Sequence, residues 1–441
     1  MLHQLNEFLR KGKITLSDLI HCLNAKIRGE HLRFANILHI FMTRLLFSLL
    51  FICGSSFSFC WADLASDSIY LTWQRDPTTT MTIQWISLPE NSNKLVSYRQ
   101  KNSSTWETAT AAATPLSKTL PLQLYRAELV QLEPFTDYVF KCADQELCFR
   151  TMPTTLTSPL RFIEGGDMYQ ENIEAFIEMN QRAALTSPDF AVLGGDIAYA
   201  VGKRHFEDIQ RWVDWIVAWH KSMVTPEKRM IPVMAAIGNH DLVGQYDQRP
   251  TQARVFSLLF PMPGPQIYNV LDFGNYLSLL LLDSGHATSI KGAQAAWLQS
   301  ALAGRRDVLY RFAIYHVPAY PSVRSFNSYR SKLIRHTWVP IFEKEQLDLA
   351  FEHHDHAYKR TYPLLRNKND PRGVIYLGDG AWGVPPRETS SGPARHYLAQ
   401  FIPVNHFIQV DLAIDQFKVT AIDLHGNIID SFMRKRTFVR P

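Results

Sequence analysis

Two different rhythms of apolar and polar residues divide the chain. Between residues 63 and 152 the apolar residues alternate with polar ones in short runs, for example at 69–73 and 81–85. This alternation is typical of half-buried β-strands. Similar runs follow at 96–99, 125–129 and 132–140. About seven such short strands in about ninety residues predict a small all-β sandwich.

From residue 160 the rhythm changes to strand, loop and helix. Apolar runs that predict buried strands lie at 160–164, 190–193, 231–237, 276–282, 312–315, 347–351 and 374–377. Between them, apolar residues recur at helical spacing in 173–184 and 206–219. Alternating strands and helices predict an α/β domain with buried sheets.

The front of the chain has the features of a targeting segment. Residues 45–62 carry no charge, and Arg44 and Met42 precede them. The stretch turns small and polar at Gly54-Ser55-Ser56 and ends at Cys60-Trp61-Ala62. A basic start, an apolar centre and a small-residue end are typical of a secretory signal peptide. We therefore predict a signal peptide at 42–62, a non-native upstream extension at 1–41, and export to the periplasm, cell surface or exterior. The alternative is an uncleaved membrane anchor, because eighteen residues can just span a bilayer; cleavage would leave no stable membrane insertion.

The charge balance and the cysteines add two expectations. The first 62 residues carry seven Lys or Arg and three acidic residues, which leaves 39 basic and 38 acidic residues in the rest. So neutral a chain has no electrostatic signature of nucleic-acid binding. Cys142 and Cys148 flank a turn between two predicted strands. In an exported protein such a pair predicts a hairpin disulfide, whereas in a reducing compartment both would be free thiols.

Residues able to hold a metal follow five of the predicted strands. The segments read Gly166-Asp167, Gly195-Asp196-Ile197-Ala198-Tyr199, Gly238-Asn239-His240-Asp241, His316, and His353-His354-Asp355-His356. Ligands of α/β sheets bind beyond the carboxyl ends of the strands. Oxygen donors mixed with imidazoles favour iron, manganese or zinc over a closed structural zinc site, which usually contains cysteine. One such motif would usually be a turn or a core histidine, but five in order favour a metal centre.

These five motifs, with Tyr199 inside the second, resemble those of the purple acid phosphatases, a family of calcineurin-like metallophosphoesterases. The resemblance extends from about Asp63 to the C-terminus. It implies a fibronectin type III-like N-terminal domain at 63–152, a linker at 153–159, and a metallophosphoesterase domain at 160–441. The fold class would be α/β, an αββα sandwich preceded by a small all-β sandwich.

The resemblance also implies a role for each ligand-type residue. An Fe(III) ion would be held by Asp167, Asp196, Tyr199 and His356. A second metal, Zn(II), Mn(II) or Fe(II), would be held by Asp196, Asn239, His316 and His354. His240 would bind no metal and would face the substrate phosphate. The implied activity is that of an acid phosphatase, in which hydroxide held at two metals hydrolyses small phosphate monoesters.

The sequence departs from the family pattern near the substrate. Tyr169 and His353 stand where the family usually has glycine, and residues 317–324 lack the histidines that plant relatives have there. The substrate pocket could therefore use Tyr169, Tyr320 or Arg324 to contact phosphate, although packing or surface roles are equally compatible with these residues. His353 could be a hydrogen-bonding neighbour of the ligands or a filler at the strand end.

Two other functions remain compatible with the sequence. A phosphodiesterase or nucleotide pyrophosphatase could use the same metal site. A cell-surface binding protein with an inactive enzyme-like domain is an alternative of another class, but it would require a lost ligand, and all seven ligand positions carry ligand-type residues. The physiological substrate and the oligomeric state do not follow from the sequence.

Overall fold

The computed structural model describes residues 63–89, 93–202, 206–264, 266–378, 380–389 and 395–436. The predicted upstream extension at 1–41 and signal peptide at 42–62 lie outside these residues. In the described part of the chain, no helix is both long and apolar enough to cross a membrane.

Eight antiparallel strands form the N-terminal all-β unit, after a short helix α4 (Leu64–Asp67). The strands are β1 (Tyr70–Thr72), β2 (Met81–Ser87), β3 (Leu95–Gln100), β4 (Glu107–Thr110), β5 (Ala112–Pro115), β6 (Gln123–Leu129), β7 (Asp137–Cys142) and β8 (Gln145–Arg150). They make two four-stranded sheets, ordered β1-β2-β6-β5 and β4-β3-β7-β8. Their inward residues, such as Trp85 and Phe140, are fully buried, as expected for a sandwich.

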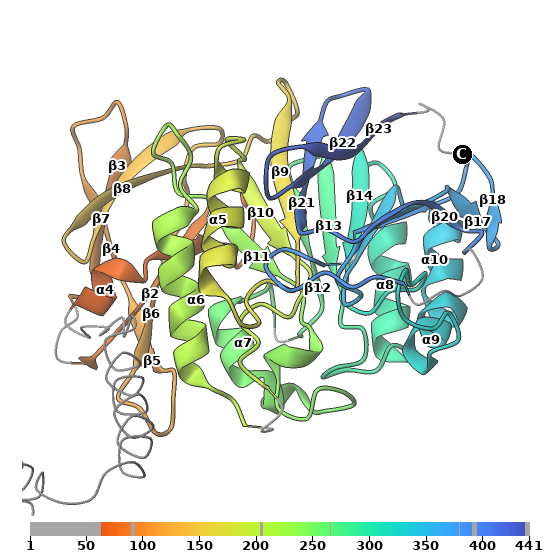
Figure 1. Cartoon of the computed structure of the whole chain (residues 1–441). Helices are drawn as coiled ribbons and strands as arrows, with labels where there is room; N and C mark the ends of the chain where they lie inside the picture. Colours follow the sequence, from red (N-terminus) through yellow and green to blue (C-terminus); the bar gives the residue numbers. More distant parts are fainter. Residues whose placement is uncertain are drawn as a thin grey trace, which may run out of the picture. The chain divides into compact units, whose positions relative to one another are not determined.

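Two larger sheets follow (Figure 1). A six-stranded sheet, ordered β11-β10-β9-β21-β22-β23, contains β9 (Leu160–Gly165), β10 (Phe190–Leu193), β11 (Val233–Ala235), β21 (His406–Leu412), β22 (Gln416–Asp423) and β23 (Ile428–Lys435). A seven-stranded sheet, ordered β12-β13-β14-β15-β19-β16-β20, contains β12 (Asn269–Phe273), β13 (Leu277–Leu281), β14 (Tyr310–Ile314), β15 (Leu349–Glu352), β19 (Ile375–Gly378), β16 (Tyr358–Thr361) and β20 (Leu398–Ile402). β17 (Leu364–Leu365) and β18 (Lys368–Asn369) form a small hairpin.

The two large sheets pack face to face, and helices cover their outer faces. Between the sheets, Phe312 of β14 lies 6.2 Å from Phe162 of β9 and 5.4 Å from Phe417 of β22, between ring centroids. Figure 1 shows α5 (Ile173–Ala184) and α6 (Ile209–Ser222) on one side of the sheets, and α8 (Ala293–Ala303), α9 (Tyr329–Thr337) and α10 (Val339–Lys344) on the other. The short helices are α7 (Arg254–Leu259), η3 (Asn239–Asp241) and η4 (Pro250–Ala253). The predicted αββα sandwich, with an all-β unit before it, is confirmed.

Local sequence explains where α5 and α6 begin. The Asn172 side chain accepts hydrogen bonds from the backbone N–H groups of Glu174 and Ala175, at 2.9 and 3.3 Å. Asp208 accepts one from the backbone of Gln210 at 3.0 Å. Such N-cap residues satisfy donors that a helix start leaves free. Apolar residues at helical spacing, among them Trp212 and Trp215 of α6, are then fully buried.

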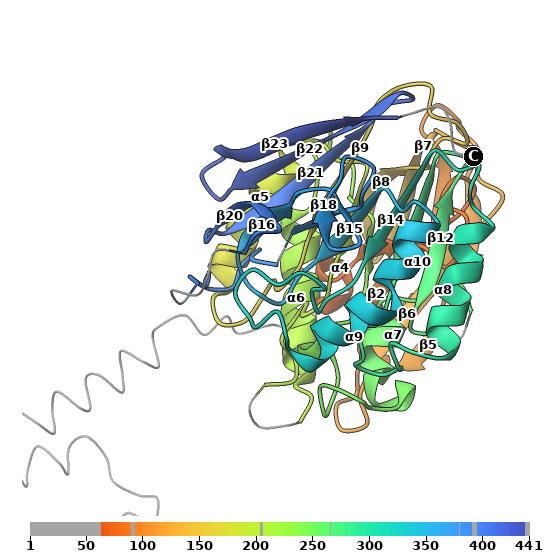
Figure 2. The ribbon, with the colours of Figure 1, turned by 90° about the vertical axis from the view of Figure 1, so that its right-hand side faces the viewer.

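Three C-terminal strands, which the pattern of apolar residues does not predict, complete the six-stranded sheet. β21 pairs antiparallel with β9, which places Ile408 opposite Glu164, and β22 and β23 extend the sheet outward (Figure 2). An apolar core also continues between the all-β unit and the sandwich, since the Trp73 ring lies 6.0 Å from Phe190 and 5.7 Å from Phe273. The domain boundaries at 63–152, 153–159 and 160–441 stay predictions.

The predicted disulfide between Cys142 and Cys148 is wrong, because both cysteines are free. In the hairpin of β7 and β8, Cys142 is paired with Gln145 and Cys148 with Val139. Positions an odd number of pairs apart point to opposite faces of a hairpin, so the two Cβ vectors diverge and no bridge can form. Cys142 lies buried in the core, and the Cys148 thiol donates to the Lys228 carbonyl at 2.9 Å.

Candidate metal centre

The sandwich brings the five motifs to the carboxyl ends of strands in both sheets. In the six-stranded sheet, Asp167 follows β9, Asp196 and Tyr199 follow β10, and Asn239 follows β11. In the seven-stranded sheet, His316 follows β14, and His354 and His356 follow β15. β9, β10 and β11 are parallel, as are β14 and β15, so each set of strand ends meets at one edge. The site therefore lies where two such edges face each other.

Three of these side chains form a first cluster. The Tyr199 hydroxyl donates to Asp167 Oδ1 at 2.9 Å and lies 3.1 Å from His356 Nε2. The same His356 nitrogen lies 2.9 Å from Asp167 Oδ1. A carboxylate, a phenol and an imidazole thus aim their donor atoms at one point, and all three residues are at least 94% buried.

A second cluster is centred on His316 Nε2. This nitrogen lies 3.0 Å from His354 Nδ1, 3.1 Å from Asn239 Oδ1 and 3.2 Å from Asp196 Oδ2. Candidate ligand atoms of Asp196, His316 and His354 all lie within 4.8 Å of one another, the spacing expected around one cation. The other ring nitrogen of His316 lies 3.0 Å from the Gly194 carbonyl, which orients the ring.

The electrostatics of the two clusters fit bound cations. Burial alone would raise the pKa of Asp196, but the imidazoles of His316 and His240 outweigh it and hold that pKa well below its usual range. Burial would lower the pKa of His316, yet Asp196 and Asp167 raise it to about 9. A proton on His316 therefore supplies positive charge that two buried carboxylates require. A cation would supply the same charge and leave the imidazole free to act as a ligand.

The chemistry of the donors is also that of a binuclear site. Two carboxylates, an amide oxygen, three imidazoles and a phenol make seven donors, too many for one four-coordinate ion. No cysteine contributes, and hard oxygen donors mixed with imidazoles suit iron, manganese or zinc. The residues present thus fit a two-metal centre.

Most of these side chains project from strained backbone. The residues with positive φ are Asp167 at 52°, Asp196 at 53°, Tyr199 at 48°, His354 at 77° and His356 at 58°. The left-handed region is unfavourable for residues other than glycine by roughly 1–2 kcal/mol. It persists where the surroundings determine the conformation, and it concentrates at functional sites. Here the sharp turn after each strand is what directs successive donors into the same space.

Buried hydrogen bonds hold two of these turns. The Asp241 carboxylate accepts from the backbone N–H groups of Asp196, Ile197 and Gly238, at 2.8, 2.9 and 2.8 Å. Asp167 Oδ2 accepts from the backbone of His354 at 2.9 Å, which ties the two sheets together at the site. Asp241 is fully buried, so its three hydrogen bonds are protected from water.

His353, at the position where glycine is usual, is a buried hydrogen-bonding residue. Its Nδ1 lies 2.9 Å from the Tyr315 carbonyl and its Nε2 lies 2.5 Å from Glu164 Oε1. Its ring fills the space beside two glycines: a Cβ on Gly194 would lie 1.8 Å from the ring and one on Gly166 would lie 2.6 Å from it. The ring therefore joins β15 to β9 below the ligands.

His240 lies beside the first cluster rather than in it. Its ring stacks on Tyr199 at 4.5 Å between centroids, and its backbone N–H donates to Asp196 Oδ1 at 2.6 Å. Its Nδ1 lies 2.7 Å from the Val201 carbonyl. That carbonyl can only accept, so Nδ1 carries a proton and Nε2 is the nitrogen left for another partner.

The three candidate substrate contacts lie in different surroundings. Tyr169 is 8% exposed and lies under the Arg211 guanidinium at 4.2 Å. Tyr320 is 1% exposed, and its hydroxyl lies 2.5 Å from Oδ1 of the exposed Asn367, so it presents no free surface to a substrate. Arg324 is one-third exposed and contacts Asp355 at 3.0 Å and the carbonyl of His354.

Two residues at the site have no signal in the sequence. The Tyr246 hydroxyl donates to Asn239 Oδ1 at 3.1 Å and lies 3.3 Å from His354 Nε2. Arg387 donates from Nη1 to the His354 carbonyl at 3.2 Å, and its backbone N–H donates to the His356 carbonyl at 2.8 Å. Neither belongs to a motif, and the loops that carry them approach the ligands only in the folded chain.

Comparison with known proteins places this architecture in a class. Residues 160–358 match the calcineurin-like phosphoesterase family, and residues 66–157 match the purple acid phosphatase N-terminal domain. The fold is therefore that of a calcineurin-like metallophosphoesterase. Within that class, the chain belongs to the purple acid phosphatase family, which implies a binuclear metal centre.

Individual relatives are distant. An uncharacterized protein of Mycobacterium tuberculosis is 25% identical over 339 residues, covering 67% of this chain and 62% of that protein. Purple acid phosphatase 21 of Arabidopsis thaliana is 22% identical over 273 residues, covering 58% of each chain. The chain thus spans about three fifths of the length of these relatives. The structure of purple acid phosphatase PPD1 from yellow lupin seeds matches with a TM-score of 0.71 at 16% identity, over 84% of this chain and 74% of that one.

Proposed function

We propose that this protein is a phosphoric monoester hydrolase that acts with two metals on small phosphate esters. The observation that carries the proposal is the pair of donor clusters around His356 Nε2 and His316 Nε2, with His240 beside them. Asp167, Tyr199 and His356 would hold one metal, Asn239, His316 and His354 the other, and Asp196 both. Bound there, two cations would neutralise the phosphoryl oxygens and lower the pKa of a water molecule to near neutrality.

Tyr199 favours a trivalent first metal. Burial and the neighbouring Asp167 carboxylate raise the pKa of this phenol well above its usual range. A phenol so reluctant to lose its proton becomes a ligand only beside a strongly acidic cation, and Fe(III) fits that requirement. No phenol is among the proposed ligands of the second cluster, which suits Zn(II), Mn(II) or Fe(II).

His240 has the geometry of a proton donor to the leaving group. The Val201 carbonyl fixes its tautomer, and stacking on Tyr199 fixes its ring, so Nε2 is held in one direction. In the imidazolium form, Nε2 would donate a hydrogen bond to the phosphate and then a proton to the departing ester oxygen. Asp196 accepts from the backbone of the same residue, which couples the position of His240 to that of the ligands.

The test combines metal analysis with hydrolysis of p-nitrophenyl phosphate and bis(p-nitrophenyl) phosphate. We expect two metals per chain and faster turnover of the monoester than of the diester. Asp196→Asn should lose metal and activity together, and Asp307→Ala, which changes an exposed residue, should retain both. Faster turnover of the diester would favour a phosphodiesterase. A metal-free, inactive protein would favour the binding-protein alternative.

Export is a separate part of the proposal. It rests on the uncharged segment at residues 45–62. Mass spectrometry of secreted protein should show a chain that begins at Asp63. A secreted form that retains residues 1–41 would contradict it.

A further inference from the structure

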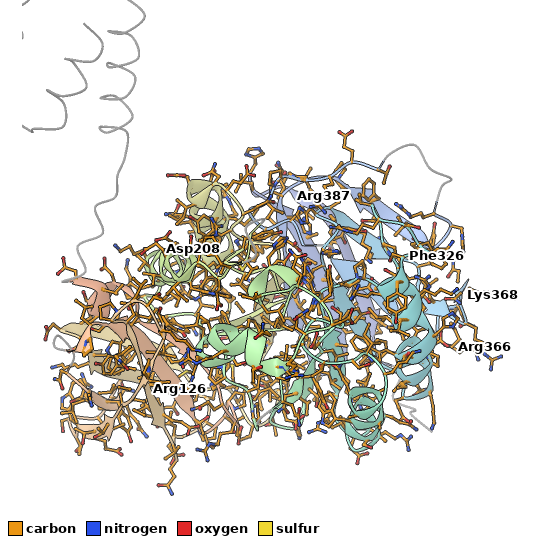
Figure 3. The ribbon with its side chains drawn as sticks, turned by 90° about the horizontal axis from the view of Figure 1, so that it is seen from below. Arg126, Asp208, Phe326, Arg366, Lys368 and Arg387 are labelled. Carbon is orange, nitrogen blue, oxygen red and sulfur yellow. The ribbon has the colours of Figure 1, made fainter. Side chains whose placement is uncertain are left out.

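Two arginines from distant parts of the chain converge on one carbonyl oxygen beside the metal centre. Arg324 follows β14 and its motif, whereas Arg387, labelled in Figure 3, lies in the segment after β19. Both donate through Nη1 to the backbone carbonyl of His354, a candidate metal ligand. Arg387 also donates its backbone N–H to the His356 carbonyl at 2.8 Å. The two guanidinium groups therefore border the ligands of both clusters.

Among the described residues, only one carboxylate is in direct contact with either guanidinium group. Arg324 contacts Asp355 at 3.0 Å, but that buried carboxylate also accepts from the backbone N–H groups of Val323 and Arg324, at 2.8 and 3.2 Å. Among the residues that the structure describes, Arg387 forms no ion pair.

Each of the two guanidinium groups keeps donors that no described residue occupies. Nε and Nη2 of both arginines have no partner among the described residues, while Nη1 of each is anchored. Arg395 steadies this region by donating to the carbonyls of Val323 and Arg324, at 2.9 Å each. The planar guanidinium fork matches the spacing of oxygens in phosphate and carboxylate groups. The anchored arginines therefore offer preorganised N–H groups at the edge of the centre.

We propose that Arg324 and Arg387 form a second anion subsite, and that the preferred substrates are small phosphate esters carrying a second oxyanionic group near the scissile phosphate. The scissile phosphoryl group lies at the metal centre with His240, and the second group lies between the two guanidinium forks. This inference rests on the proposed hydrolytic function, because it assigns the substrate class of the same site.

Matched substrates test the subsite through kcat/KM. Propyl phosphate has one phosphate, propane-1,3-diol bisphosphate adds a second, and 3-(phosphonooxy)propanoate adds a carboxylate instead. We expect the metal-loaded enzyme to prefer a dianionic substrate to propyl phosphate by at least tenfold, since charge-assisted hydrogen bonds are the strong ones. The two dianionic compounds distinguish a phosphate subsite from a carboxylate subsite. Equal kcat/KM for all three compounds would overturn the proposal.

Variants separate a binding role from a structural one. Arg387→Gln should reduce the preference for dianionic substrates over propyl phosphate to less than threefold, and Arg387→Lys should keep part of that preference. Arg372→Gln removes an exposed arginine that pairs with Asp370, and it should change neither value. If Arg387→Gln slows all substrates by the same factor, the residue only supports the His354 loop and the proposal fails.

A binding measurement keeps the inference distinct from the hydrolytic function. Calorimetry would compare methylenediphosphonate, phosphonoacetate and methylphosphonate on the metal-loaded protein. Methylenediphosphonate can also chelate the two metals through both phosphonates, and that effect would persist in Arg387→Gln. Only tighter binding of the ligands with a second anionic group that is lost in this variant therefore supports the subsite. If no ester is hydrolysed but the preference depends on Arg387, the hydrolytic function fails and the subsite stands. If esters are hydrolysed but the preference is unchanged in the variant, the subsite fails and the hydrolytic function stands.

Discussion

Asp241 offers the sharpest test of how the fold supports the metal centre. Its carboxylate is fully buried and accepts three backbone hydrogen bonds, from Asp196 and Gly238 through Oδ2 and from Ile197 through Oδ1. Asp241→Ala leaves all three N–H groups without an acceptor. An unsatisfied buried donor costs about 1–3 kcal/mol. Water entering the vacated space and relief of the repulsion with Asp196 favour the lower end of this range for each donor. We therefore expect Asp241→Ala to lower the free energy of unfolding by about 3–4 kcal/mol.

Asp241→Asn separates the hydrogen bonds from the volume of the side chain. An amide oxygen placed at Oδ2 keeps the bonds from Asp196 and Gly238, while the amide nitrogen faces the Ile197 N–H and loses the third bond. The expected loss is therefore about 1–2 kcal/mol, clearly smaller than for alanine. Both variants should also bind metal more weakly, by about 10–100-fold, because the turn that presents Asp196 loosens.

Urea denaturation of the metal-free protein, followed by circular dichroism, gives the free energy of unfolding, and titration with metal gives the affinity. Asp307→Ala is the matched control, since this aspartate is exposed and should change stability by less than about 0.5 kcal/mol. A value for Asp241→Ala equal to that of the control would refute the reasoning. Asparagine and alanine variants of equal stability would show that packing, and not hydrogen bonding, is what Asp241 contributes.

Three further predictions concern the site and the response to pH. His240→Ala should lower kcat by about 10²–10⁴-fold with both metals retained, and loss of metal in that variant would identify His240 as a ligand instead. The iron-loaded wild type should show a visible charge-transfer band that is absent in Tyr199→Phe, whereas a colourless, active wild type would contradict the Fe(III) assignment. Burial lowers the pKa of His406 from 6.5 to about 4, so the unfolded chain binds the extra proton between these values. The contribution of the neutral His406 to the free energy of unfolding is complete above pH 6.5 and is lost, by about 3 kcal/mol, as the pH falls to 4. In His406→Gln, the midpoint of denaturation should therefore depend less on pH over that range.

Much of the fold and of the candidate site could be predicted from short-range features of the sequence. The buried strands β9, β10 and β14 are apolar runs in the sequence. They are followed directly by polar residues able to bind a metal, such as Asp167 and His316. Chain order and strand polarity suffice to predict that the strand ends within one sheet meet at one edge, and the structure brings the edges of two sheets together. The seven proposed ligands could therefore be chosen without coordinates, and the structure brings them together.

Only the tertiary structure decided what depends on register and on long-range contacts. The pairing of β7 with β8 turns Cys142 and Cys148 to opposite faces, which spacing along the chain cannot show. β21 inserts beside β9 from about 250 positions away, and Arg387 reaches the His354 carbonyl from a loop without a motif. The local pattern of a sequence determines which residues are strands, turns and donors. Which donors meet is decided by packing between distant segments, because only packing fixes their distance and direction.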